Sequence, residues 1–171
     1  MRTLLASSAV LAALFIAALV PAAVGARSTK ILEFESMVGV TRPLGGATGA
    51  IRGINGAGLP WVIGAAKGEL STDGQLEVRF SGLVFDPSDQ GVIDRGLAGT
   101  NSQASMRVVV SCVTGAGAIQ NLFTDAFPVT TGLDAGNGKV ETHLSLPAPC
   151  VAPIVLITNS AGTGWFAAMG R

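Results

Sequence analysis

The sequence predicts an all-β fold: a two-sheet antiparallel sandwich of about eight or nine strands, with a β-barrel as the alternative. Apolar and polar residues alternate with a period of two in several short segments, which is typical of half-buried strands. Turn-forming residues separate these segments, and Gly alone accounts for 23 of the 171 residues. No segment after residue 26 shows a helical period of useful length. Two packed sheets are therefore the economical arrangement.

The first 26 residues are typical of an export signal. Arg2 precedes an apolar run from Leu4 to Val20, and Val24-Gly25-Ala26 supplies the small residues of a cleavage site. We expect a helical signal peptide over residues 1–26 and a single secreted β-sandwich domain over residues 27–171. An uncleaved membrane anchor is the alternative, although the run barely reaches the roughly 20 residues that span a bilayer.

Charge and cysteine content narrow the possible partners. Arg2 is one of 11 basic residues, and without it the chain is slightly acidic. This excludes the basic footprint of a nucleic-acid-binding protein, and membrane contact is expected only through an uncleaved signal segment. Cys112 and Cys150 predict a disulfide in an exported chain, with two buried free thiols as the alternative. Two Cys and one His do not complete a structural zinc site, so we expect no metal and no cofactor.

The clearest element is a β-hairpin from Trp61 to Phe85. Thr72-Asp73-Gly74 suits a three-residue loop in which Gly74 adopts a positive φ. Closing the loop there fixes the register, since a slip of one residue would mix the apolar face with the charged face. The expected pairs are Leu70 with Leu76, Glu69 with Glu77, Gly68 with Val78, Lys67 with Arg79 and Ala66 with Phe80.

At the open end of this hairpin the polar face becomes apolar. The extended register places Ile63 opposite Leu83, and Trp61 opposite Phe85. These four residues are a candidate binding patch, because a Trp often anchors a binding surface. The alternative is burial under a neighbouring loop such as residues 43–49, since Trp is usually highly buried.

The other expected strands follow in chain order, and loops connect them. The strands are residues 31–40, 50–54, 104–113, 119–127, 139–146, 154–158 and 165–169. Asn55-Gly56 is a tight-turn signal. Residues 86–103 are longer than an ordinary loop, which predicts a structured crossover or a functional loop. Residues 41–49 and 128–138 are the other long loops.

Paired carboxylates are the strongest of the weak catalytic signals. Glycoside hydrolysis uses two carboxyl groups roughly 5–10 Å apart. Glu33 with Glu35, or Glu69 with Glu77, fits this separation on a strand face. Any polar strand face would fit it too, and an exposed face does not supply the shifted pKa that a catalytic acid needs.

Two further groups of polar residues invite a chemical interpretation. His143, the only histidine, shares an outward strand face with Glu141 and Ser145, but a solvated polar face is the simpler explanation. Three carboxylates lie in one loop and bring together the oxygen ligands that Ca²⁺ favours: Asp86, Asp89 and Asp94. Ordinary turn chemistry explains the same residues, and the sequence does not decide between the two.

Several segments together resemble small secreted bacterial proteins of unassigned function. The segments are RGINGAGLPWVI, GELSTDGQLEVRFSGLVF, VVVSC, and LPAPCVAPIVLITN followed by GWFA. They carry the patterns GINGxGLPW and GELxxDGxLxV. The resemblance covers most of the chain after residue 35. It implies a single exported β domain with paired cysteines, and it brings no catalytic residues.

The sequence therefore favours a secreted, non-enzymatic extracellular binding or structural module, whose partner is an unknown ligand or surface. Three observations support this interpretation: the sequence has no credible set of catalytic residues, its net charge is near neutral, and it has long loops. A secreted hydrolase that uses paired carboxylates is one alternative. A cell-surface protein anchored by an uncleaved N-terminal helix is the other.

Overall fold

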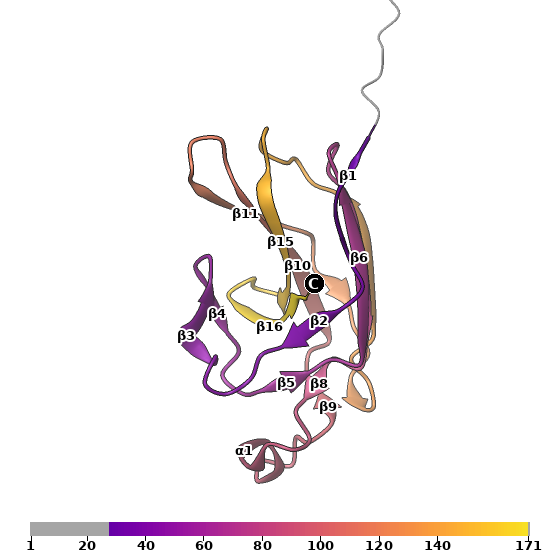
Figure 1. Ribbon diagram of the computed structural model, residues 1–171. Coiled ribbons are helices and arrows are strands. Elements are labelled where there is room, and N and C mark those ends of the chain that lie inside the picture. Colours follow the sequence, from indigo (N-terminus) through magenta and orange to yellow (C-terminus); the bar gives the residue numbers. More distant parts are fainter. Residues whose placement is uncertain (1–27, 171) are drawn as a thin grey trace, which may run out of the picture.

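The computed structural model describes residues 28–170, where every regular element except one short helix is a strand (Figure 1). The predicted all-β class is therefore confirmed. The signal peptide expected over residues 1–26 lies outside the described residues. The elements are β1 (Lys30–Phe34), β2 (Met37–Gly39), β3 (Gly46–Ile51), β4 (Ile54–Gly56), β5 (Trp61–Val62), β6 (Ala65–Ser71), β7 (Gln75–Ser81), β8 (Val84–Phe85), α1 (Gln90–Ile93), β9 (Thr100–Asn101), β10 (Ser105–Val113), β11 (Ile119–Phe123), β12 (Phe127–Pro128), β13 (Gly132–Leu133), β14 (Gly138–His143), β15 (Val151–Asn159) and β16 (Gly164–Met169).

The strands form two larger sheets and two short pairs. Sheet A has the order β1-β6-β7-β14, and sheet B has the order β11-β10-β15-β16-β4-β3, with β12 on β10 and β2 on β16. Strands β5 and β8 pair separately, as do β9 and β13. Figure 1 shows sheet A on one side and sheet B curled opposite it. We expected about eight or nine strands in total, divided between two sheets. The described chain instead has sixteen strands in four sheets, so that part of the prediction was too simple.

The central hairpin of sheet A has the predicted register. Leu70 lies opposite Leu76 and Glu69 opposite Glu77, and the pairing continues in step to Ala65 and Ser81. The loop closes through the Gly74 amide, which donates to the Ser71 carbonyl at 2.9 Å, with Gly74 at φ +94°. The apolar face of this hairpin is buried, so the two-residue period and the turn together determine the register.

The hairpin is not one continuous ladder as expected. Trp61 does pair with Phe85, in the register predicted, but β5 and β8 form their own small sheet. The ladder breaks between Gly64 and Gly82, where Gly82 has φ +66°. A residue with positive φ cannot continue an extended strand, so the chain bends at this point.

The segment expected as one strand over residues 31–40 divides between the two sheets. β1 pairs with β6 in sheet A, whereas β2 pairs with β16 in sheet B. Ser36 lies at the crossing, where its carbonyl accepts from the Gly170 amide at 2.9 Å. The chain therefore connects sheet A to sheet B here, and it leaves part of the β6 edge without a β1 neighbour.

One hydrophobic core joins the two larger sheets. β10 and β15 run through its centre, and β10 is buried on both faces as predicted for a central strand. The largest fully buried side chains come from both sheets and from the segments between them: Trp61, Leu70, Leu76, Leu83, Met106, Leu156, Ile157, Val40, Val78, Val92, Val108 and Val109.

The curl of sheet B is closed by the turn between β3 and β4. That turn is Arg52-Gly53, both at positive φ, and not Asn55-Gly56 as expected, since Asn55 lies inside β4. The Arg52 guanidinium donates to the carbonyls of Ser111 at 2.7 Å and Ala152 at 2.8 Å. The Asn121 amide of β11 donates to the Arg52 carbonyl at 3.0 Å. These bonds connect the turn to β10, β11 and β15.

The predicted disulfide is present. Cys112 in β10 is bonded to Cys150, just before β15, with a Cα–Cα distance of 5.0 Å. The β10–β15 ladder shifts register between Ser111 and Val113, so the bridge lies beside an irregularity in that pairing. The disulfide and the Arg52 contacts thus secure the same part of sheet B.

Candidate functional site

The predicted apolar patch is not an exposed surface in this structure. Trp61 is 2 % exposed, Leu83 0 % and Phe85 8 %, and Ile63 is half-buried. The Trp61 ring packs against Phe85 and Phe166, with ring centroids 4.2 Å and 4.4 Å apart. These side chains therefore belong to the core, where one ring from β8 and one from β16 pack against Trp61.

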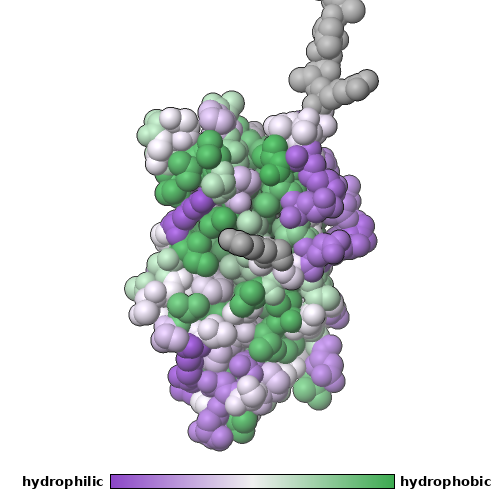
Figure 2. All heavy atoms as spheres, viewed as in Figure 1, coloured by the Kyte–Doolittle hydropathy of each residue, from purple (hydrophilic) through white to green (hydrophobic). Residues whose placement is uncertain are grey.

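The outer face of sheet A carries charged residues in two rows across the strands. In the first row, Glu33, Glu69, Glu77 and Glu141 lie directly opposite one another on the four strands. In the second row, Lys67, Arg79 and Lys139 lie opposite one another on β6, β7 and β14. We call these the acidic row and the basic row. Figure 2 shows hydrophilic residues gathered along the side of the molecule where β1 and β6 lie.

Phe34 and Gly68 lie between the charged positions of β1 and β6 and contact each other on the inner face of the sheet. Phe34 lies opposite Gly68 and is only 3 % exposed, so its side chain points to the inner face. A Cβ on Gly68 would lie 2.6 Å from the Phe34 ring, so only glycine leaves room for it. The outer surface between Glu33 and Glu35 is therefore backbone, without a side chain at the middle position.

Ion pairs connect neighbouring charges within the face. Lys30 Nζ lies 2.9 Å from Glu33 and 2.8 Å from Glu69, and these two hydrogen bonds raise the pKa of Lys30. Arg79 Nε lies 2.5 Å from Glu77, whose pKa is held below its usual range by this hydrogen bond. All of these side chains are at least partly solvated, so each pair contributes little to stability.

A shallow depression of about 250 Å³ lies on this face. Phe34 and Gly68 are among the residues that line it. Its walls are four carboxylates and two cations: Glu33, Glu35, Glu69, Glu77, Lys67 and Arg79. A second depression continues past Glu35 toward Ala65 and Ser81 along the uncovered edge of β6. The arrangement can hold charged groups of a partner, and the excess of carboxylates favours positive ones.

The paired carboxylates expected for a hydrolase both lie on this face. Glu69 and Glu77 face each other across β6 and β7, while Glu33 and Glu35 lie on and just after β1. A general acid of a glycosidase needs a raised pKa. The Arg79 contact lowers the pKa of Glu77 instead, which does not suit that role.

His143 lies at the end of β14, opposite Gln75, and is exposed. Within residues 28–170, it makes no side-chain hydrogen bond with a serine or a carboxylate. Ser145 lies beyond the end of β14, so the ladder of Glu141, His143 and Ser145 does not continue as one strand. This group is a solvated strand end.

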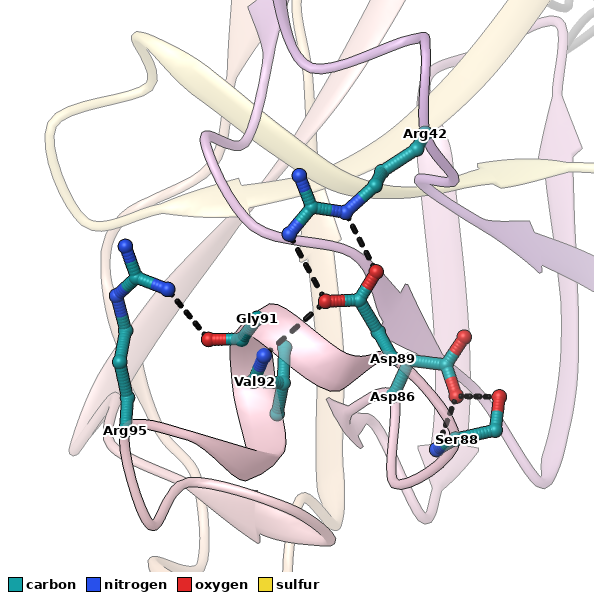
Figure 3. Close-up of polar contacts among 7 residues, drawn as sticks. All are labelled: Arg42, Asp86, Ser88, Asp89, Gly91, Val92 and Arg95. Carbon is teal, nitrogen blue, oxygen red and sulfur yellow. Dashed lines mark hydrogen bonds and ion pairs between the residues drawn. The ribbon is translucent and has the colours of Figure 1, made fainter.

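The three aspartates of the 86–103 loop each have a separate partner, and Figure 3 shows the contacts of two of them, Asp86 and Asp89. Asp86 accepts from the Ser88 amide at 2.8 Å, and Asp94 accepts from Gln90 at 2.7 Å. Asp89 caps α1 by accepting from the Val92 amide at 3.0 Å, and it forms a two-point ion pair with Arg42. In the part of the chain that the structure describes, no three His, Cys, Asp or Glu side chains are grouped to hold a metal ion.

The Arg42–Asp89 pair predicts a pH dependence of loop stability. Hydrogen bonding to Arg42 lowers the pKa of Asp89. A lowered carboxylate pKa stabilises the fold above the ordinary Asp range, and this contribution is lost as pH falls through the lowered value. We expect wild type to melt above Asp89→Asn at neutral pH and the two melting curves to converge in strong acid. Equal melting temperatures at neutral pH would contradict this role.

The sequence predicted which charged residues point outward, but it did not predict that their strands would pair into two rows. The alternation in residues 139–146 predicted a strand with Lys139 and Glu141 outward. Nothing local indicated that β14 would pair with β7 and extend both rows by one strand. That neighbour relation joins segments about 60 residues apart and becomes visible only in the fold.

No family model, curated protein or solved structure matches this chain. Among the described residues, no helix has the length and apolar character needed to cross a membrane.

Proposed function

We propose that this chain is a secreted, non-enzymatic binding or structural module that engages a charged partner through the outer face of sheet A. The observation that carries this proposal is the depression walled by Glu33, Glu35, Glu69 and Glu77 together with two cations. A rigid antiparallel sheet holds these groups in fixed register, so the face is organised before any partner arrives.

The character of the carboxylates supports binding over hydrolysis. They are solvated and several are ion-paired, and the pKa of Glu77 is lowered. Such groups steer and position charged partners well, whereas acid–base chemistry at neutral pH needs a carboxyl group with a raised pKa. The disulfide is consistent with an oxidising compartment.

Binding to polymers of known charge tests the proposal. We expect polylysine to bind the purified protein and to shift the amide signals of β1, β6 and β7, while dextran sulfate and neutral dextran bind more weakly. Glu69→Gln with Glu77→Gln removes two negative charges from the depression without changing side-chain size, and we expect it to weaken polylysine binding about tenfold.

Asp125→Asn is the matched control, because Asp125 is exposed and lies outside sheet A, between β11 and β12. It removes one charge and is expected to bind polylysine nearly as well as wild type. Amide shifts spread over the whole surface, or equal losses in the control, would contradict a site on sheet A.

Export is tested separately by intact mass. Protein recovered from culture medium with Arg27 as its first residue is the expected result for a secreted module. Full-length chain retained in the membrane fraction would favour the anchored alternative.

A further inference from the structure

The two charged rows lie side by side at a spacing set by the sheet. Glu69 and Lys67 are two residues apart on β6, and Glu77 and Arg79 are two residues apart on β7. Alternate residues on one strand lie about 7 Å apart, and neighbouring strands about 4.8 Å. The face therefore carries two parallel lines of opposite charge, each crossing the strands.

This pattern is complementary to itself under one symmetry operation. Two copies packed face to face are related by a twofold axis that lies in the interface. An axis parallel to the strands would place the acidic row on the acidic row. An axis parallel to the rows, midway between them, places the acidic row of each copy over the basic row of the other. Only the second arrangement is electrostatically favourable.

We propose that a second copy of this chain is a partner of the outer face of sheet A, in this row-exchanging arrangement. The proposal rests on the proposed function, since it names the partner of the same face. Glu69 then faces the second copy's Lys67, and Glu77 faces the second copy's Arg79. On β14, Glu141 faces the second copy's Lys139. Within each chain, Lys30 already pairs with Glu33 and Glu69, Arg79 with Glu77, and Lys139 with Glu141. The cations of the second copy therefore share these carboxylates with the chain's own cations.

The size of the face sets the strength of this association. Four strands, with three alternate residues along each, cover on the order of 400 Å² per copy. A standard stable interface uses about 800 Å² per partner. The dimer is therefore weak and held by solvated charges, so it dissociates as salt screens them.

Sedimentation of the purified wild-type protein gives the first test. We expect a concentration-dependent dimer in about 0.05 M NaCl and at least a tenfold weaker association in about 0.5 M NaCl, where the screening length falls severalfold. Monomer at every concentration in low salt would overturn the proposal. An association that strengthens with salt would also overturn it, because it would point to an apolar contact.

Charge-reversed variants give the sharper test. Lys67→Glu with Arg79→Glu leaves the central strands wholly acidic, and Glu69→Lys with Glu77→Lys leaves them wholly basic. We expect neither variant to self-associate, and a one-to-one mixture of the two to form a heterodimer in low salt. Asp125→Lys, a reversal outside sheet A, is expected to dimerise like wild type.

The mixture separates this inference from the proposed function. Circular dichroism first shows whether both variants are folded. If each folded variant dimerises like wild type, or if their mixture stays monomeric, a second copy is not the partner of this face. Polylysine binding to sheet A in a strictly monomeric protein would leave the binding function standing with a different partner. If the protein neither dimerises nor binds polylysine, the binding function and the second copy as partner are both wrong.

Discussion

Replacing either cysteine of the disulfide with alanine is expected to lower the free energy of unfolding by about 4 kcal/mol, with a range of roughly 2–5 kcal/mol. Cys112 and Cys150 are separated by 38 positions in the sequence, so the bridge constrains a long loop in the unfolded chain. It also joins the end of β10 to the start of β15, two neighbouring inner strands of sheet B. Both effects disappear when either sulfur is removed.

Urea unfolding of Cys112→Ala, Cys150→Ala and the double variant measures this effect. Because one substitution already opens the loop, we expect similar losses for the two single variants and little further loss for the double. Wild type treated with a reductant is the control and is expected to unfold near the single variants. Losses that add independently would contradict a shared bridge.

Gly74→Ala is expected to destabilise the protein by more than about 2 kcal/mol, for two separate reasons. Gly74 has φ +94°, where an L-residue costs roughly 1–2 kcal/mol. A Cβ built there would also lie within van der Waals overlap of the Leu144 carbonyl oxygen, and that backbone cannot move freely because the Leu144 amide donates to the Gly74 carbonyl at 2.9 Å. The substitution therefore strains the hairpin loop and the end of β14 together.

Gly53→Ala separates these two reasons. Gly53 also has a positive φ, +86°, but a Cβ there meets no atom within 4 Å. We expect it to cost only the conformational part, about 1–2 kcal/mol. Chemical denaturation of the two variants under identical conditions measures the difference, and a Gly74→Ala loss no larger than that of Gly53→Ala would show that the contact with Leu144 has no effect.

Features encoded within one hairpin were predictable from the sequence. The register of β6 and β7 follows from Thr72-Asp73-Gly74 and from the alternation on both sides of it, and the predicted pairs from Leu70 with Leu76 to Ala66 with Phe80 are present. The disulfide was also predictable, because the first 26 residues predict export and paired cysteines are typical of exported chains. In both cases the signal lies in a few residues and does not depend on distant neighbours.

Features that depend on distant neighbours were not predictable. Asn55-Gly56 has the composition of a tight turn, yet the turn forms at Arg52-Gly53. Arg rarely adopts a positive φ, but here its guanidinium reaches two carbonyls of sheet B, which offsets the local strain. The Asn55 position instead pairs with Gly164 in a parallel contact that no local pattern indicates.

In the candidate site, too, local features were predictable and features that depend on distant neighbours were not. Sequence alternation places Glu69, Glu77, Lys67 and Arg79 on one face, but β1 and β14 join that face through nonlocal pairing. Trp61 was a candidate binding residue because its position continues the polar face of the hairpin. The bend at Gly64 and Gly82 separates it from that face, and Phe166 of β16 covers it.

Sheet A has one arrangement on which the site depends: its charged residues lie in aligned rows on one face, while the alternate residues build the core. Cross-strand nuclear Overhauser effects in the dissolved protein test it most directly. The structure predicts contacts that link Glu33 to Glu69, Glu69 to Glu77, and Glu77 to Glu141. Contacts shifted by one residue on a strand would turn the buried side chains of that strand outward, such as Leu76 on β7, and would contradict this arrangement.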